Sequence, residues 1–349
     1  MDHGEIASRD FYFVGGEYAG PPGEERMHGQ MYVEAFVPRR SRHPYPLVMF
    51  HGAGQTGTNW LATPDGRMGW AEYFVREGYA VYVVDQPARG RSAWQPAIDG
   101  EMMTFNAPQQ EWLFTASADD PRWPQAKLHT QWPGTGHRGD PVFDAFQATQ
   151  VPFLADAVEI QRLVQTAGVA LLDRIGPAIL MTHSQSGTFG WIMAEARPGL
   201  VKAVVALEPA GPPFENMILF GGKGRAWGVA DLPLTYDPPA ASPEALDVEQ
   251  QDEPDHPDLV CCWRQKAPAR RLVNLADKPV LILTGEASYH AVYDHCTARY
   301  LSDAGVPVTY IRLEDRGIRG NGHMLMLEKN SLEIAALVAD WLATTIPAA

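Results

Sequence analysis

The sequence predicts an α/β fold with a doubly wound, mostly parallel sheet, and three observations carry this prediction. Short apolar runs recur along the chain, most of them are continuously apolar, and amphipathic helical patterns separate them. Continuous apolar runs are typical of strands that helices cover on both faces. Strands that alternate with helices are typical of this fold class. With 349 residues, of which 45% are hydrophobic, the chain is long enough to bury a large core.

The predicted strands are rich in β-branched residues and are bounded by Gly, Pro or Asp. They cover residues 46–50, 80–84, 178–181, 201–207, 279–284 and 306–313. A 3.6-residue period predicts helices over 153–167 and 332–342, and the run 188–196 is also compatible with a helix. Upstream of the parallel strands, residues 30–37 predict an antiparallel strand.

Two long segments interrupt this alternation. Residues 93–151 contain four tryptophans among many Pro and Gly residues, and residues 211–268 contain GGKGRAWG and DPPAASPEA. Ordinary connections are much shorter, so excursions of this length usually serve as lids or binding walls. We expect one domain over residues 1–349, with 93–151 and 211–268 as insertions that form a lid or pocket wall. A surface loop is the alternative for each.

The charge balance limits the possible partners. Lys and Arg total 28 against 42 Asp and Glu, which gives a net charge of −14. We therefore expect no nucleic-acid or membrane partner, because phosphate-rich surfaces require a concentrated basic face. Three cysteines cannot form a disulfide framework, and the acidic start of the chain does not resemble an export signal. These features predict a soluble, cytoplasmic protein with reduced cysteines.

A glycine motif follows the strand at 46–50. Gly52, Gly54 and Gly57 match G-x-G-x-x-G, and Asp85 ends the next strand, as in a dinucleotide-binding fold. In such a fold a helix must begin at the motif, but Pro64 interrupts any helix there. The favoured interpretation is a turn whose backbone N–H groups point into a cavity and supply part of an oxyanion hole.

The segment THSQSG, which follows the strand at 178–181, contains the candidate nucleophile. It is a relaxed form of G-x-S-x-G, with Thr182 and Ser186 at the glycine positions around Ser184. Small residues are needed there because the nucleophile lies on a strained turn between a strand and a helix. The helix that follows directs its N–H groups toward the site, so the Gln185 N–H could stabilise an oxyanion.

A serine hydroxyl requires a base, and the candidate is His323 in the loop after the last predicted strand. Gly320 and Gly322 allow this loop to bring the imidazole over the edge of the sheet. The acid could be Glu208, Glu286 or, less favourably, Asp294. Glu208 is favoured because a carboxylate at the end of a central buried strand is costly without a partner.

Together these segments resemble the α/β-hydrolase superfamily, and most of all a small bacterial carboxylesterase subgroup. The resemblance runs from about Phe11 to Leu342. It rests on HPYPLVMFHGAGQTG, TPDGRMGWAEYFVREGY, VVDQPARGRS, LHTQWPGTG with GDPVF, THSQSG and GNGHMLMLEKN. It implies an α/β-hydrolase fold. It also implies Ser184 as nucleophile, His323 as base, Glu208 as an acid just after the sixth strand, and the N–H groups of Ala53 and Gln185 as oxyanion donors.

The resemblance further implies that a carboxylic ester is hydrolysed through an acyl-enzyme on Ser184, without a metal or organic cofactor. It does not identify the ester, and a lactone or thioester stays possible. Two alternatives are an NAD-type oxidoreductase and a non-catalytic small-molecule receptor on the same fold. His290, His295 and Cys296 do not match a zinc signature. The expected partner is a small-molecule ester, and a homodimer is possible. Residues 214–227 and four aromatic side chains are candidates for the binding wall: Trp60, Trp94, Trp112 and Trp132.

Overall fold

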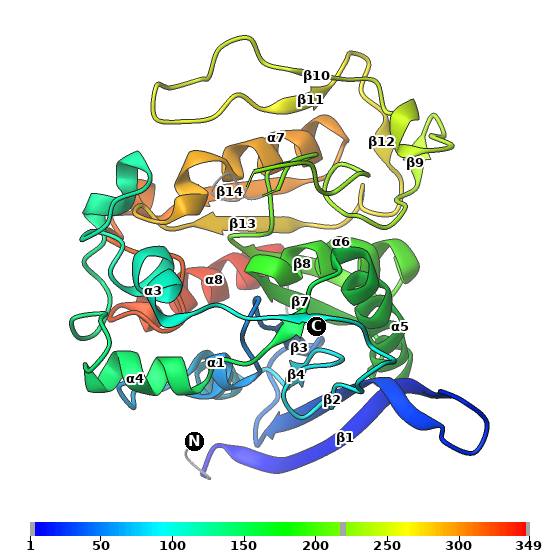
Figure 1. Cartoon of the computed structure of the whole chain (residues 1–349), viewed down its shortest axis with the longest axis vertical. Coiled ribbons are helices and arrows are strands. Elements are labelled where there is room, and N and C mark those ends of the chain that lie inside the picture. Colours follow the sequence, from blue (N-terminus) through cyan, green and yellow to red (C-terminus); the bar gives the residue numbers. More distant parts are fainter. Residues whose placement is uncertain (1–3, 217–220, 347–349) are drawn as a thin grey trace.

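A computed structural model describes residues 4–216 and 221–346, and its centre is an eight-stranded sheet. In spatial order the strands are β1 (Ile6–Ala19), β2 (Arg26–Pro38), β4 (Val81–Asp85), β3 (Leu47–Phe50), β7 (Ala178–His183), β8 (Val201–Leu207), β13 (Val280–Thr284) and β14 (Val308–Arg312). Neighbouring strands from β4 to β14 pair in parallel, whereas β2 pairs antiparallel with both β1 and β4. Figure 1 shows β1 and β2 at one edge of the sheet and β13 and β14 toward the other.

Helices cover both faces of the sheet, and their side chains form a hydrophobic cluster with the strands on each face. One cluster takes its side chains from α5 (Ala157–Ile175), α6 (Gly187–Ala196) and α7 (Asp294–Asp303), and the other from α2 (Trp70–Arg76) and α8 (Ser331–Thr345). Alternate residues of the central strands point into different clusters: Met181 belongs to the cluster that includes α8, and Leu180 belongs to the cluster that includes α6. The parallel strands are therefore buried on both faces, which explains their continuous apolar runs.

The predicted doubly wound, mostly parallel sheet is confirmed, and β8 has the predicted bounds. The helix predicted over 153–167 is shifted. Phe153–Leu154 forms the short strand β6, and α5 begins at Ala157 because the Asp156 side chain accepts hydrogen bonds from the N–H groups of Val158 and Glu159. The edge strand β1 was not predicted. Most of its side chains are exposed or half-buried, so it carries no apolar pattern.

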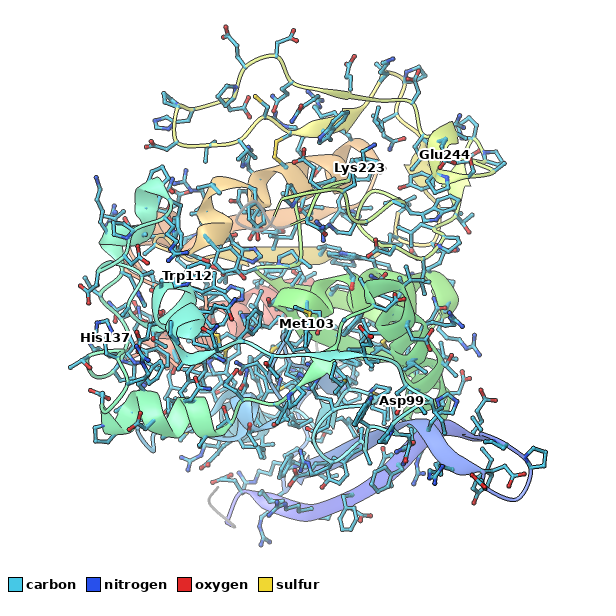
Figure 2. The ribbon with its side chains drawn as sticks, in the orientation of Figure 1. Asp99, Met103, Trp112, His137, Lys223 and Glu244 are labelled. Atoms are coloured by element: carbon cyan, nitrogen blue, oxygen red, sulfur yellow. A yellow bond between two sulfur atoms is a disulfide. The ribbon has the colours of Figure 1, made fainter. Side chains whose placement is uncertain are left out.

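The first excursion, residues 93–151, is irregular chain interrupted by short helical elements. Figure 2 places Trp112 on this segment and Lys223 and Glu244 on the second excursion, residues 211–268. The first contains β5 (Met102–Met103), α3 (Ala107–Gln110), η1 (Glu111–Thr115), η2 (Pro124–Leu128) and α4 (Pro141–Ala148). The second contains β9 (Tyr236–Asp237), η4 (Pro243–Ala245), β10 (Val248–Gln250) and β11 (Trp263–Gln265). The remaining short elements are α1 (Thr58–Leu61), η3 (Ser184–Ser186), β12 (Arg271–Leu272), η5 (Tyr289–Val292) and η6 (Leu313–Arg316).

The cysteines correct the expectation of reduced thiols. Cys262 beside β11 forms a disulfide with Cys296 on α7, and Cys261 is free. The sequence did not suggest this pairing because 34 positions separate the two residues. The bridge ties the second excursion to the helix that packs against β14. Among residues 4–216 and 221–346, none of the helices combines the length and apolar character needed to cross a membrane.

Candidate functional site

Ser184 lies on a sharp turn between β7 and α6. Its φ of 56° is in the left-handed region, which a non-glycine residue adopts only where the surroundings enforce it. The buried Ser186 hydroxyl accepts a hydrogen bond from the His183 N–H (2.8 Å) and donates one to the Phe50 carbonyl (3.0 Å). A Cβ on Gly187 would lie 2.4 Å from Cβ of Pro209, so only glycine fits at this point. The turn therefore tolerates Ser186 through hydrogen bonding and requires Gly187 by close packing.

The loop after β14 and the end of β8 bring His323 and Glu208 together. His323 Nδ1 donates to Glu208 Oε2 at 2.5 Å, although 115 positions separate the two residues. Glu208 also accepts from the Gly285 N–H (2.7 Å, Oε1) and the Ser288 hydroxyl (2.6 Å, Oε2). Both partners of this dyad are fully buried. The carboxylate therefore receives three hydrogen bonds from two segments, the loop after β13 and the loop after β14, and its contact fixes the proton of His323 on Nδ1.

Burial dominates the electrostatics of the dyad. Burial lowers the pKa of His323 well below its ordinary value, and His183 and His290 lower it further. Burial raises the pKa of Glu208 well above its ordinary value, and Asp294 adds to this rise, while Ser288 and Gly285 oppose it. The imidazole is therefore neutral at ordinary pH, which is the state that a general base requires.

Tyr289 contacts the imidazole and lines the same cavity as Ser184. Its hydroxyl donates to His323 Nε2 at 3.2 Å. Among the described residues, the hydrogen bond at Nε2 thus comes from Tyr289 and not from Ser184. Burial raises the pKa of Tyr289 well above its ordinary value, so this hydroxyl stays protonated. Tyr289 therefore occupies the imidazole nitrogen that does not contact Glu208.

The two other candidate acids have partners elsewhere. Glu286 accepts from Arg319 (2.6 Å) and from the Gly320 N–H (2.8 Å) at the protein surface. Asp294 accepts from His290 Nδ1 (2.8 Å) and the Thr284 hydroxyl (2.7 Å). Of the three carboxylates, Glu208 is therefore the one that contacts His323.

The predicted oxyanion donors Ala53 and Gln185 line the same cavity as Ser184. A Cβ on the neighbouring Gly52 would lie 3.0 Å from Cβ of Ser184, so the two turns approach closely. The buried Arg89 joins them: it donates to the Gly52 carbonyl and to Gln185 Oε1, both at 3.1 Å. Burial lowers the pKa of Arg89 to about 9, and the side chain still carries its charge at neutral pH.

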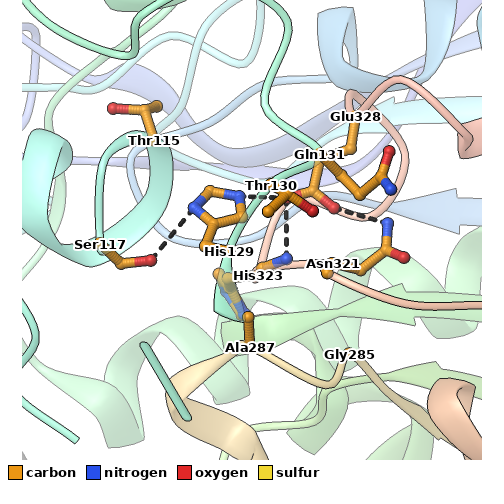
Figure 3. A network of polar contacts seen from close by, with 12 residues as sticks. Thr115, Ser117, His129, Thr130, Gln131, Gly285, Ala287, Asn321, His323 and Glu328 are labelled. Carbon is orange, nitrogen blue, oxygen red and sulfur yellow. Dashed lines mark hydrogen bonds and ion pairs between the residues drawn. The ribbon is translucent and has the colours of Figure 1, made fainter. Parts of the chain in front are cut away.

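A second buried network holds the loop that carries His323 (Figure 3). Glu328 accepts from the Gly322 N–H (2.8 Å), from Asn321 Nδ2 (2.7 Å) and from His129 Nε2 (2.7 Å). His129 belongs to the first excursion and also contacts the Ser117 hydroxyl (3.1 Å). Glu328 thus joins the histidine loop to an insertion almost 200 positions away.

The cavity that contains Ser184 is small, about 150 Å³. The first excursion contributes Phe105, Leu113 and Phe114, and the Phe114 ring stacks on His323 with 5.3 Å between centroids. The prediction of tryptophans in this wall is wrong for the described lining residues. Trp60 and Trp132 are buried in the core, Trp112 packs under Arg122, and Trp94 is 39% exposed. Their large apolar surfaces are more useful in packing than around a small cavity.

The geometry weighs against the dinucleotide interpretation of the glycine motif. The helix after the motif, α1, ends at Leu61, after a single turn. Both carboxylate oxygens of Asp85 are occupied, by the Gly57 N–H (2.7 Å) and by Arg91 (2.8 Å). Asp85 therefore holds the turn and has no free oxygen to offer a ribose.

Within residues 4–216 and 221–346, two groups of side chains bring potential metal ligands within 4.8 Å of one another. Cys262, His295 and Cys296 form one group, but its two sulfurs are joined in the disulfide. The other consists of Glu208, His290 and His323, in which His323 and Glu208 bond each other and His290 bonds Asp294. Hydrogen bonds within the site already use these donor atoms.

Several residues at the site were not predicted from the sequence. Arg89 follows β4 in VVDQPARGRS, Tyr289 and His290 follow β13, and Arg225 lies within GGKGRAWG. Of these, only Arg225 fell inside a predicted binding segment, residues 214–227. The others lie close to the ends of parallel strands, and that position is the one signal that could have identified them.

Comparisons with known proteins bear on the family and the fold. Residues 47–337 match the model of the alpha/beta hydrolase family. The chain is 48% identical over 336 residues to the probable secreted lipase phiG of Fungal sp. (strain ATCC 74256), covering 95% of this chain and 88% of that protein. A solved structure of a novel bacterial esterase is 23% identical, with a TM-score of 0.68 over 98% of this chain and 96% of the other, and it supports the fold.

Proposed function

The chain belongs to the alpha/beta hydrolase family, and we propose that it is a serine hydrolase that cleaves carboxylic esters through an acyl-enzyme on Ser184. The observation that carries this proposal is the buried His323–Glu208 dyad at the cavity that also contains Ser184. The lipase relative supports an ester as the substrate. Glu208 as triad acid also supports the bacterial carboxylesterase subgroup that the sequence resembles.

In the proposed mechanism, His323 removes the Ser184 proton as the hydroxyl attacks the ester carbonyl. Glu208 orients the imidazole and stabilises the imidazolium that forms. The N–H groups of Ala53 and Gln185 bind the tetrahedral oxyanion, and one such donor can contribute about 3 kcal/mol. Expulsion of the alcohol leaves the acyl-enzyme, which water hydrolyses with the same base.

Tyr289 adds a step to this mechanism. Its hydroxyl occupies His323 Nε2, the atom that must receive the serine proton. The tyrosine therefore has to release Nε2 when the ester binds.

The cavity volume supports small substrates. About 150 Å³ is the size of a cavity that holds benzene, so one side of the ester has only a few carbon atoms. Lactones and thioesters of similar size could use the same groups, because the fold does not separate these reactions. We propose that the two excursions act as pocket walls, supported by Phe105, Phe114 and Arg225 in the lining.

The compartment is a separate question. The cytoplasmic location stays a prediction from the sequence. The Cys262–Cys296 disulfide and the name of the fungal relative, a probable secreted lipase, both favour an oxidising compartment.

Labelling with a fluorophosphonate probe tests the proposal. We expect the wild-type protein to be labelled and to hydrolyse short esters, and Ser184→Ala to lose both properties while its unfolding transition stays in place. Ser302→Ala, an exposed serine on α7, is the matched control and should be labelled like the wild type. An unlabelled wild-type protein would support the non-catalytic receptor, and persistent labelling of Ser184→Ala would place the nucleophile elsewhere.

A further inference from the structure

Arg225 is the only charged side chain among the described residues that line the cavity of Ser184. The other described lining residues are apolar, neutral polar or histidine, and none of them is a carboxylate. This is unusual in a chain with a net charge of −14. The cavity next to the proposed nucleophile therefore has a local positive charge, opposite in sign to the whole protein.

The guanidinium of Arg225 has few partners of its own. Nε donates to the Pro212 carbonyl at 3.0 Å, and the backbone N–H donates to Asp231 Oδ1 at 2.6 Å. Nη2 is buried and has no hydrogen-bond partner among the described residues, and only 7% of the residue is exposed. No ion pair of Arg225 is found in the described part of the chain. The buried guanidinium of Arg225 is thus held through Nε while its Nη2 has no hydrogen-bond acceptor among the described residues.

An unused buried donor is costly, so it needs a physical reason. Burial lowers the pKa of Arg225, and Asp231 and Tyr293 oppose this change. If the side chain only braced the Pro212 carbonyl, a neutral donor would do so without the desolvation cost of a charge. A planar guanidinium is suited to carboxylates because its N–H groups can bind two oxygens at once. A ligand carboxylate in the cavity would satisfy Nη2 and compensate the charge.

We propose that Arg225 binds a carboxylate of the substrate, and that the preferred substrates are small esters with one free carboxylate. This inference rests on the proposed function, because it names the class of ester that the Ser184 site accepts. The cavity of about 150 Å³ limits the group beside the ester to a few non-hydrogen atoms. The carboxylate could be on the acyl side, as in the monoester of a dicarboxylic acid, or on the alcohol side, as in an acylated hydroxy acid.

Two pairs of esters of nearly equal shape distinguish these cases. Monomethyl succinate is compared with methyl 4-methylpentanoate, and acetoxyacetate with isobutyl acetate, so that an isopropyl group replaces the carboxylate in each pair. We expect the wild-type protein to have the higher kcat/KM for the charged member of at least one pair. That pair identifies the side of the ester that faces Arg225. A preference for the neutral member in both pairs would overturn the proposal.

Substitution of the arginine tests its role directly. Arg225→Met should lower the charged-to-neutral ratio of kcat/KM by about 10- to 100-fold, the range expected for a lost charge-assisted hydrogen bond. Arg225→Lys should retain part of the ratio. Arg162→Met removes a positive charge from an exposed site on α5 and should leave the ratio unchanged. An unchanged ratio in Arg225→Met, or an equal loss in Arg162→Met, would refute the assignment.

A binding measurement separates this proposal from the proposed function. Calorimetry with Ser184→Ala and monomethyl succinate or acetoxyacetate needs no turnover. We expect binding of the ester from the preferred pair, and its loss when Arg225→Met is added. If the wild-type protein hydrolyses no ester and resists the fluorophosphonate, the proposed function fails, yet this binding still tests Arg225. If neutral esters are hydrolysed and neither charged ester binds, only the inference on Arg225 is wrong.

Discussion

Replacement of Glu208 by glutamine is the sharpest test of how the site is built. The side chain keeps its size, but the two carboxylate oxygens receive three donors: the Gly285 N–H on Oε1, and Ser288 and His323 on Oε2. If the glutamine NH₂ faces His323, it donates to Nδ1 and moves the imidazole proton to Nε2. That tautomer cannot accept a proton from Ser184. If the NH₂ faces Gly285 instead, this NH₂ and the Gly285 N–H are two buried donors that face each other without an acceptor, which is costly.

We expect the wrong tautomer to lower kcat by about 10³- to 10⁴-fold, or about 4 to 5.5 kcal/mol at 1.36 kcal/mol per tenfold change. The assay is steady-state hydrolysis of a short neutral ester, with circular dichroism to show that the variant folds. Glu286→Gln is the matched control, because Glu286 pairs with Arg319 at the surface, and its activity should change by less than about 3-fold. Glu208→Gln within about 10-fold of the wild-type activity, or a larger loss in Glu286→Gln, would refute the reasoning.

Three further predictions concern the surroundings of the dyad. Because burial lowers the pKa of His323 below 6.5, the base stays neutral as pH falls, and kcat/KM for a neutral ester should be flat from pH 8 to below pH 6.5; an acid limb at or above pH 6.5 would contradict this. Glu328→Gln should lower the free energy of unfolding in urea by about 1 to 3 kcal/mol and also reduce kcat, since it weakens the histidine loop, whereas the exposed Glu333→Gln should do neither. Paired substitution of Cys262 and Cys296 by serine should cost about 3 to 4 kcal/mol of unfolding free energy for a loop of this length, and equal stability of the reduced and oxidised protein would show that the bridge adds nothing.

The sequence by itself determined the parallel strands of the sheet and the candidate residues at their ends. The continuous apolar runs led to β3, β4, β7, β8, β13 and β14 because residues buried on both faces leave a local signature. Ser184 and His323 became candidates for a similar reason, since the small residues around a strained turn and the glycines of a loop are recognised from neighbours in the chain. Glu208 was favoured on the cost of burying a carboxylate, but Glu286 stayed equally compatible with the order of residues.

Only the tertiary structure decided which distant groups meet. It brought Glu208 to His323 and left Glu286 on Arg319, placed Tyr289 on the imidazole, and paired Cys262 with Cys296. It also put Trp60 and Trp132 into the core, whereas the sequence had suggested that they line the pocket. These contacts join segments tens to hundreds of positions apart. They depend on how the excursions fold back over the sheet, and local periodicity contains no information about that path.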